Sequence, residues 1–436
     1  MDPLIVLAIL LCMLFILLAL RMPVAITLIT LSLLGIAIIR SPLAAFATLA
    51  GIPYDFSAHW SLSAIPMFLL MGALSHRGGL TSSIFKAAKI WLGKTTGGLA
   101  ISTNVATAAF SAASGSSLAA TAAMARLAGP EMLAAGYAPS LASSVIAAAG
   151  TVGALIPPSI LLIIYGWYAE QPIGELLMAG FLPGLLTAVV YCLVIYLRCR
   201  ISPDIAPPCH DEVTPSQKLK VLMKIWPLPL LIFSIMGSIY TGIATATEAA
   251  ALGCIIALLV IIFRGDFSIR VILSSLSDSL KSTAAIFFIA IGAALFANLI
   301  AISGLPNQVG EFINEISLTP TMLMLIFVFT YLLLGIFLDP IGIMLITLPI
   351  FLPAFNALNM NLIWIGIVLV KLIEIGLITP PVGLNVFIVK DAFGDSVAIG
   401  DIFRGLIWFI VAEIFIVGIL ILFPKITLFL PQLMSS

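Results

Sequence analysis

Charged side chains are scarce in this sequence: Asp, Glu, Lys and Arg make up 9% of its 436 residues, against about a quarter in a typical soluble protein. Hydrophobic residues reach 62%, and the mean hydropathy is +1.25. The net charge is zero, so nothing indicates a nucleic-acid partner. The apolar runs are too long and continuous for a strand-built barrel. The sequence therefore predicts an all-α polytopic membrane protein in a lipid bilayer.

Histidine and cysteine are also few. The five cysteines form no CxxC pair, which argues against a disulfide framework or a zinc site. The three histidines, His59, His76 and His210, fall in predicted loops or at interfaces. No base is therefore positioned to activate a serine in Ser114-Gly-Ser116, as an intramembrane serine protease would require. Neither an HExxH motif nor a P-loop is present, so we predict no metalloprotease, no ATP-driven pump and no other enzyme.

One motif occurs twice: a glycine and a Pro-Pro pair inside an apolar run. The copies lie at residues 150–159 and 374–383, and aligning their Pro-Pro pairs also aligns Gly153 with Gly376. Proline removes a backbone donor and glycine permits unusual torsions, so each copy should break a helix. Broken helices are tolerated in hydrocarbon only inside protein or along a watery cavity. A matching pair of them is typical of a transporter's binding site.

Each predicted break is preceded by a second unusual segment. Residues 97–125 are rich in Gly, Ala, Ser and Thr, and each arm beside the cluster at 111–117 is shorter than the about 20 residues that span a bilayer. This pattern predicts a re-entrant hairpin with its tip at 114–117. Residues 321–356 form a second candidate hairpin around 335–340.

The order of these segments defines two repeats. Gly115 precedes Pro157 by 42 positions, and Asp339 precedes Pro380 by 41. We predict a first repeat at 1–197, a linker at 198–224 and a second repeat at 225–436. The first repeat contains the hairpin 97–125 and the broken helix 138–168; the second contains the hairpin 321–356 and the broken helix 362–389.

The remaining segments are simpler. Residues 41–60 are expected to form a polar-aromatic loop, 76–96 an amphipathic interfacial helix, and 266–281 a second interfacial segment. The first run has no basic region before it and no cleavage site after it, so we expect a retained helix, not a signal peptide. Single crossings are predicted at 4–20, 23–39, 61–75, 178–197, 226–240, 247–263, 283–302 and 405–423.

The basic residues predict the orientation. If Met1 lies outside and each hairpin returns to its own side, 16 of the 19 Lys and Arg residues are cytoplasmic. Only Arg40 and Lys425 lie outside, and Lys371 lies in the membrane. This bias agrees with the positive-inside rule, and it makes the two repeats inverted with respect to each other.

The hairpin tips and helix breaks should place carbonyl and hydroxyl oxygens at mid-membrane, where they suit a small hard cation. We predict one cation site between the first hairpin and the first break, and another between the second hairpin and the second break. Asp339 would lower the cost of dehydrating the cation. The competing interpretation is that small residues merely allow close helix packing. The candidate ligands are Ser111, Ser114, Gly115, Ser117, Gly150, Thr151, Gly153, Gly335, Asp339, Gly376 and Thr379.

Exposed helix N-termini in the same region suit an anionic substrate. Arg126 could attract the anion, although a snorkelling interfacial arginine is the simpler interpretation. The candidate substrate residues are Ser116, Arg126, Pro157, Pro158, Pro380, Pro381, Gly383 and Asn385.

Few ionisable residues are expected within the membrane: Glu248, Asp339, Lys371 and Glu374. Each is a functional candidate because burying a charge is costly. Lys371 and Glu374 are three positions apart on one helix, so we expect an internal ion pair between them. Glu248 follows a turn, and we expect it to cap the start of its helix.

A channel would need a ring-forming filter, which is absent; broken helices favour alternating access instead. The chain resembles the large, DctM-type membrane subunit of tripartite ATP-independent periplasmic (TRAP) transporters over nearly its whole length. The stretches that carry the resemblance are 65–72, 97–98, 114–117, 150–166, 245–251, 337–340 and 374–385. One departure is Ala246, where the family often has proline.

The resemblance implies an elevator-type transporter of the bacterial inner membrane, with a transport domain that slides against a scaffold. Na⁺ would bind at the two hairpin and break sites and drive uptake of an organic anion, such as a C4-dicarboxylate or sialic acid. The implied partners are a small four-helix membrane subunit and a periplasmic substrate-binding protein. The chain begins at the first helix of the large subunit, so we expect the small subunit to be a separate polypeptide. The alternative is a binding-protein-independent sodium/carboxylate symporter or ion antiporter.

Overall fold

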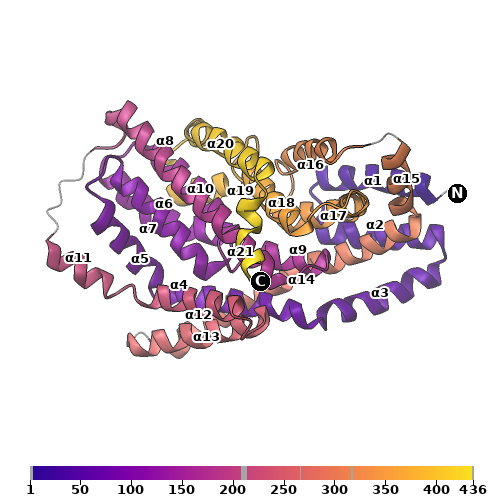
Figure 1. Ribbon diagram of the computed structural model, residues 1–436, viewed down its shortest axis with the longest axis horizontal. Coiled ribbons are helices and arrows are strands. Elements are labelled where there is room, and N and C mark those ends of the chain that lie inside the picture. Colours follow the sequence, from indigo (N-terminus) through magenta and orange to yellow (C-terminus); the bar gives the residue numbers. More distant parts are fainter. Residues whose placement is uncertain (1–2, 208–213, 266, 316–317, 435–436) are drawn as a thin grey trace.

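The computed structural model describes residues 3–207, 214–265, 267–315 and 318–434. Within these ranges the chain is helical with no strand, which confirms the predicted class. Figure 1 shows an elongated molecule with the N-terminus at one end. The C-terminal helix lies near the middle of this view.

A helix–turn–helix pair forms the first hairpin: α6 (Gly98–Ser114) and α7 (Ser117–Ala134). Its tip lies at the predicted place, but α7 continues past the predicted end at residue 125. Gly115 turns the chain with φ +63°, a torsion that glycine adopts without the steric cost of a Cβ. Ser116 then caps α7, because its Oγ accepts a hydrogen bond from the Ala119 amide at 3.4 Å. Nearly all of α6 is buried, which its small side chains permit.

The first broken helix is also confirmed. It consists of α8 (Pro139–Gly150), the short 3-10 helix η2 (Thr151–Ala154) and, after a gap, α9 (Ile160–Tyr168). Ser159 caps α9 by accepting from the Leu162 amide at 3.3 Å.

The second half contains the corresponding elements. The second hairpin is α16 (Pro320–Leu334) and α17 (Pro340–Ala357), and the second broken helix is α18 (Leu362–Gly376) and α19 (Leu384–Phe393). The peptide bonds Pro157–Pro158 and Pro380–Pro381 are both cis.

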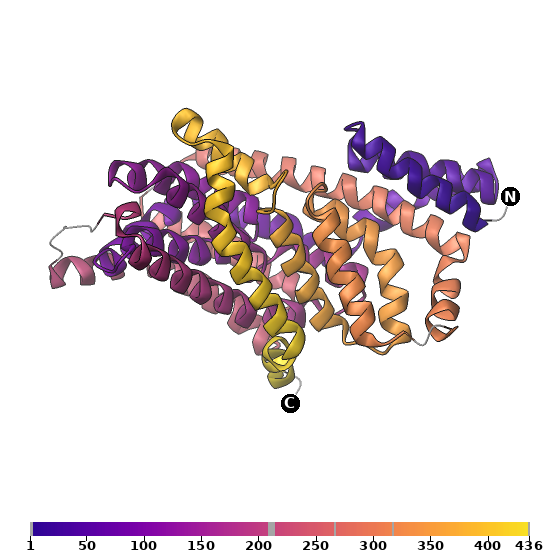
Figure 2. The same ribbon diagram turned by 90° about the horizontal axis from the view of Figure 1, so that it is seen from above.

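Single helices pack around these elements, most of them where crossings are predicted. Helix α14 (Ile269–Ser303) lies along α2 and α4, and α4 lies along α13. In Figure 2, α1 and α2 form the N-terminal end of the molecule beside α14. Besides α14, these single helices are α1 (Pro3–Ala19), α2 (Val24–Ile39), α4 (Ala64–Arg77), α12 (Pro227–Tyr240) and α13 (Ala246–Phe263).

Two expectations about these segments are wrong. Residues 41–60 are not a loop but contain helix α3 (Pro42–Ser57). Ser41 caps it by accepting from the Ala44 amide at 3.1 Å, and Pro42 occupies the first turn, where proline is well tolerated. The segments predicted at 266–281 and 283–302 are not two elements either, because α14 joins residues 269–281 of the first to the second as one helix of 35 residues. Residue 266 lies outside the described residues.

The amphipathic segment at 76–96 contains α5 (Leu80–Leu92). The linker expected at 198–224 is partly helical: α10 (Ile173–Ile201) enters it, and η3 (Pro203–Ile205) and α11 (Pro215–Leu222) follow. Residues 208–213 of that linker lie outside the described residues. The remaining helices are η1 (Trp60–Ser63), α15 (Leu305–Glu315), η4 (Gly394–Ser396), α20 (Ile399–Leu422) and α21 (Lys425–Met434).

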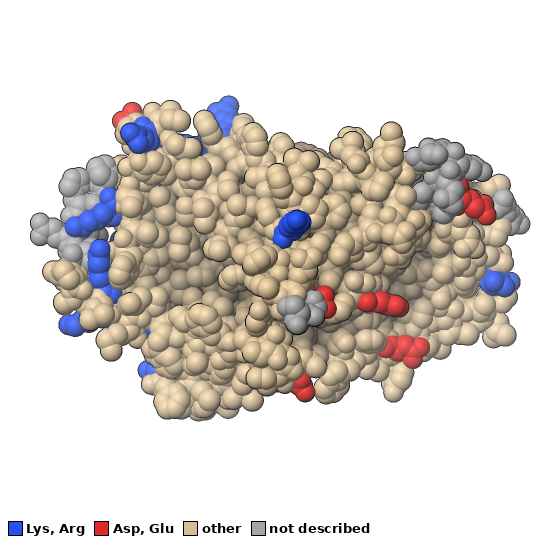
Figure 3. All heavy atoms as spheres, viewed as in Figure 1, with Lys and Arg blue, Asp and Glu red and all other residues tan. Residues whose placement is uncertain are grey.

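The described part of the chain has 5 helices long and apolar enough to cross a membrane, or up to 7 if each of two bent helix pairs is one span. Figure 3 shows most of the lysine and arginine side chains on this face at the end formed by α5, α7 and α11. A wide surface with few charges covers the rest of the face. Long apolar helices with a charged end are what a multi-pass membrane protein requires.

Candidate ion and substrate sites

A cavity of about 830 Å³ lies beside the tip of the first hairpin. Three helix N-termini line it: α7 at Ser116–Leu118, α9 at Ile160–Leu161 and α17 at Asp339–Ile341. The free amides and dipoles of helix N-termini attract negative charge. The cavity thus joins the first hairpin, the first broken helix and the second hairpin around one space.

Ionisable side chains lie along the wall of this cavity, on α4, α7 and α14 and at the start of α17. Arg126 lines it from α7, and His76 lines it from the last turn of α4. Asp278 also lines it, but forms an ion pair with Arg77. Arg126 is therefore the cavity-lining cation on the hairpin that carries the tip.

At the first predicted cation site, the first hairpin and the first helix break are in close contact. A Cβ added at Gly153 would lie 2.9 Å from Ser111 Oγ and 3.2 Å from Ser117 Cα, so only glycine fits between the hairpin and the break. A Cβ at Gly150 would lie 1.8 Å from Thr121 Oγ1. Thr121 is a residue that sequence reasoning missed, although it lies one helical turn after Ser117.

Several hydroxyl groups of this site are buried. The hydroxyls of Ser114 and Thr121 have no hydrogen-bond partner among the described residues, while Ser111 donates to Thr107 O at 2.7 Å. Unpartnered buried polar atoms are rare and costly. Thr151, by contrast, is joined to another network: its Oγ1 lies 3.1 Å from the Tyr191 hydroxyl oxygen.

At the second predicted cation site, the second hairpin and the second helix break are equally close. A Cβ at Gly376 would lie 2.5 Å from Gly335 O, so the carbonyl at the hairpin tip faces the start of the break. Thr379 donates to Ile375 O at 2.7 Å. Asp339 caps α17 by accepting from the Gly342 amide at 2.9 Å, and its carboxylate lines the cavity.

The predicted substrate residues divide into two groups. Ser116 and Arg126 line the cavity. Pro158 touches the hairpin tip instead, since a Cβ on Gly115 would lie 2.6 Å from its carbonyl oxygen. Asn385 donates to Ala147 O at 3.1 Å and so links the two broken helices. Pro157, Pro380, Pro381 and Gly383 lie near the breaks but are not part of the cavity wall.

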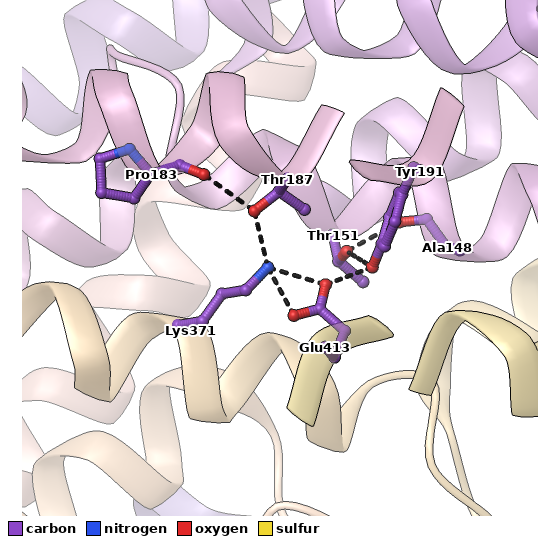
Figure 4. Close-up of polar contacts among 7 residues, drawn as sticks. All are labelled: Ala148, Thr151, Pro183, Thr187, Tyr191, Lys371 and Glu413. Atoms are coloured by element: carbon purple, nitrogen blue, oxygen red, sulfur yellow. Dashed lines mark hydrogen bonds and ion pairs between the residues drawn. The ribbon is translucent and has the colours of Figure 1, made fainter. Parts of the chain in front are cut away.

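The expected Lys371–Glu374 ion pair is wrong. Lys371 Nζ lies 2.6 Å from Glu413 Oε2 on α20 and donates to Glu413 Oε1 at 2.7 Å and to Thr187 Oγ1 at 3.0 Å. Figure 4 shows Lys371 pointing away from its own helix towards α10 and α20. A spacing of three residues permits an ion pair within one helix, but Lys371 pairs with Glu413 on the neighbouring helix α20 instead. The sequence analysis does not include Glu413 among the intramembrane ionisable residues. Its position within the predicted crossing 405–423 could have identified it, because an acidic residue inside a membrane span is a functional candidate.

The same network reaches the first break. Tyr191 donates to Glu413 Oε1 and lies beside Thr151 (Figure 4). Lys371 and Glu413 are 0% and 1% exposed, so the ion pair is fully desolvated. This network ties α18, α20 and α10 to η2.

Glu374 has a different partner. Its Oε1 accepts a hydrogen bond from Ser117 Oγ at 2.5 Å, which joins the second broken helix to the tip of the first hairpin. Glu248, in contrast, is exposed and forms a capping box with Thr245 at the start of α13, which confirms its expected role.

Two hairpins and two broken helices within a bundle of apolar helices, with a cavity shared by both hairpins and the first break, are typical of a secondary transporter of the membrane-spanning class. A family model described as "Tripartite ATP-independent periplasmic transporter, DctM component" matches residues 11–426. The chain belongs to this family.

Relatives with named substrates are similar over most of the chain. The C4-dicarboxylate TRAP transporter large permease protein DctM of Pseudomonas aeruginosa is 34% identical over 87% of this chain and 88% of its own. The ectoine large permease TeaC of Halomonas elongata is 31% identical over 96% and 97%. The sialic acid large permease SiaM of Vibrio cholerae is 29% identical over 86% and 87%.

A solved structure shares the fold. The Alcanivorax borkumensis YdaH transporter, described as having an unusual topology, superimposes with a TM-score of 0.60 over 87% of this chain and 88% of that one. Its sequence is 16% identical. This protein is thus the large permease subunit of a TRAP transporter and not an enzyme.

Proposed function

We propose that this large permease subunit imports an organic anion together with Na⁺, by an elevator movement, and receives the anion from a periplasmic binding protein. The cavity that three helix N-termini share supports the anionic substrate. Serine hydroxyls cap α7 and α9, so no carboxylate offsets the positive ends of these two helices, whereas Asp339 caps α17. Arg126 adds a full positive charge along the wall. A carboxylate is the group that C4-dicarboxylates, sialic acids and ectoine have in common.

Sodium is proposed as the coupling ion because of the oxygen atoms at both hairpins. No group of three or more His, Cys, Asp or Glu residues that could hold a metal is found among the described residues, which disfavours a transition metal. Hydroxyl and carbonyl oxygens at helix breaks suit Na⁺. Ser114, Ser117 and Thr121 would hold it at the first site, and the Gly335 carbonyl at the second.

The elevator proposal follows from how the helices group. The hairpins and broken helices pack on one another, and the first hairpin and both broken helices also pack on α10 and α20, whereas α2, α4, α13 and α14 form a second group. The two groups meet where α17 packs on α14 and α6 on α4. We propose that the first group moves as the transport domain and the second is the scaffold. The cavity lies between them, since α4 and α14 line one wall and α7, α9 and α17 the other.

The other components are proposed from the family. A tripartite transporter has a small membrane subunit and a periplasmic binding protein besides the large permease. We propose a separate small subunit of four helices, a location in the bacterial inner membrane and a periplasmic N-terminus. Arg126 and His76 then lie at the cytoplasmic end of the cavity, so this arrangement is inward-facing.

The test is uptake into proteoliposomes that hold this chain and its small partner. C4-dicarboxylates, sialic acid and ectoine, each radiolabelled, would be offered with and without the binding protein and a sodium gradient. Uptake that needs both confirms the proposal and names the substrate. Uptake driven by sodium but indifferent to the binding protein would indicate a binding-protein-independent symporter, and uptake indifferent to sodium would refute the coupling ion.

A further inference from the structure

We propose that helix α11, together with the neighbouring part of α5, binds the headgroups of anionic phospholipids at one surface of the membrane. This surface is cytoplasmic in the proposed orientation, but the preference for anionic lipid does not depend on which side it is. The ligand is a lipid of the surrounding bilayer, recognised by its negative charge.

Helix α11 (Pro215–Leu222) is a surface element that the rest of the protein does not cover. None of its residues is buried. Leu219, Leu222 and Met223 are 61%, 47% and 70% exposed, and their spacing of three and four residues places them on one helical stripe. An uncovered apolar stripe on a helix of a membrane protein fits contact with lipid.

The place of α11 in the chain puts it at the membrane boundary. It leads into α12 (Pro227–Tyr240), and the two helices are long and apolar enough for one membrane span only as a pair, bent by 43°. Trp226, at the junction, is 47% exposed. Tryptophan is enriched where the hydrocarbon core meets water, so the bend lies where α12 reaches the headgroups and α11 turns along them.

Lysine side chains accompany this apolar stripe. Lys218 and Lys220 lie on α11, and Lys224 lies in the turn that follows. Helix α11 packs against α5, which adds Lys86 and, two residues past its end, Lys94. Figure 3 shows basic side chains gathered at this end of the molecule. Four of the five lysines are exposed, and Lys218 is half-buried.

The contact between the two helices brings their lysines to one surface. Lys218 Nζ lies 5.3 Å from the ring centroid of Trp91 on α5, within the range of a cation–π interaction. Trp91 is itself 49% exposed. The lysines of both helices and the two tryptophans, Trp91 and Trp226, therefore border the same region.

The protein does not neutralise this positive charge. In the part of the chain that the structure describes, none of the five lysines forms an ion pair, and Glu131 on α7 is paired with Lys89. Asp211 and Glu212 precede α11 and lie outside the described residues. Five lysines against these two acids still leave an excess of three positive charges. Anionic headgroups attract each such lysine near the surface, whereas neutral lipid does not.

The experiment places a fluorescent reporter on α11 of the full-length protein in nanodiscs. With the five native cysteines replaced by serine, Ser216→Cys carries an NBD label one turn before Leu219, so that the lysines and the apolar stripe stay intact. The phosphatidylcholine nanodiscs contain increasing mole fractions of a spin-labelled lipid that quenches NBD, either phosphatidylglycerol or phosphatidylcholine. Half-maximal quenching should need several-fold less phosphatidylglycerol than phosphatidylcholine, and high salt should remove this difference.

Two sets of substitutions assign the preference to α11. The triple variant Lys218→Gln, Lys220→Gln, Lys224→Gln should lose it, by about fivefold for each lysine removed, equivalent to about 1 kcal/mol. The matched control, Arg270→Gln, Lys281→Gln, Arg404→Gln, removes three exposed basic residues elsewhere and should keep it.

Three results would overturn the inference. Equal quenching by the two lipids would show that α11 does not recognise charge. A preference that survives in the lysine variant, or that the control variant loses equally, would show that α11 is not its source. A reporter that neither lipid quenches would place α11 away from the bilayer. None of these results bears on the proposed transport activity, since no substrate or sodium gradient is used.

Discussion

The buried ammonium group of Lys371 contacts Glu413 and Thr187. Replacing Lys371 alone should therefore destabilise the folded protein. Lys371→Met would leave Glu413 charged and desolvated, so we expect the free energy of unfolding to fall by about 3–5 kcal/mol. The measurement is thermal or denaturant unfolding of the full chain in detergent. A stable variant with a greatly raised substrate requirement would show instead that Lys371 contacts the substrate.

The matched control removes both charges. The double variant Lys371→Met, Glu413→Leu leaves no unpaired ion, and replacement of a buried pair by apolar residues is often neutral or stabilising. We therefore expect it to be more stable than Lys371→Met alone. If it is less stable, the hydrogen bond from Tyr191 to Glu413 matters more than the ion pair.

Asp339 caps helix α17 and also places a carboxylate at the cavity. An asparagine at this position would keep the cap and remove the charge. Asparagine caps a helix as well as aspartate does, so Asp339→Asn should fold and reach the membrane. Loss of the carboxylate at the cavity should weaken sodium activation of uptake by about tenfold, equivalent to about 1.4 kcal/mol. The measurement is the sodium concentration that gives half-maximal uptake in proteoliposomes. An unchanged value would remove Asp339 from the proposed site.

At the scale of elements, each hairpin tip touches its broken helix through glycine. Gly376→Ala would place a Cβ 2.5 Å from Gly335 O, and such overpacking costs about 1–3 kcal/mol. We expect the second hairpin to move away from the break and uptake to be largely lost. Gly418→Ala is the matched control, since its Cβ would meet nothing within 4 Å, and it should transport normally. Equal uptake by the two variants would contradict the proposed site.

Glycine and proline spacing made these elements predictable, because they act locally on the backbone wherever they occur. The polar-aromatic composition of residues 41–60 predicts a loop instead of helix α3, although the Ser41-Pro42 start is a helix signal. The partner of Lys371 could not be inferred from spacing, because Glu413 lies on another helix and only packing brings the two together. The Glu374–Ser117 contact likewise joins opposite halves of the chain.

At the scale of the whole molecule, the cavity and the charge distribution together predict which side is open. Ala122 lines the cavity on α7, and Ala58 is exposed after α3. With the five native cysteines replaced by serine, a membrane-impermeant thiol reagent should label Ala122→Cys in inside-out vesicles and Ala58→Cys in right-side-out vesicles.

The same variants test whether the cavity holds the transported anion. A saturating substrate, identified by the uptake panel, should slow the labelling of Ala122→Cys and leave that of Ala58→Cys unchanged. Labelling of the two positions from the opposite sides would reverse the proposed orientation. Labelling of Ala122→Cys that substrate does not affect would place the anion elsewhere, because a ligand held by the N-termini of α7, α9 and α17 fills the space in front of this residue.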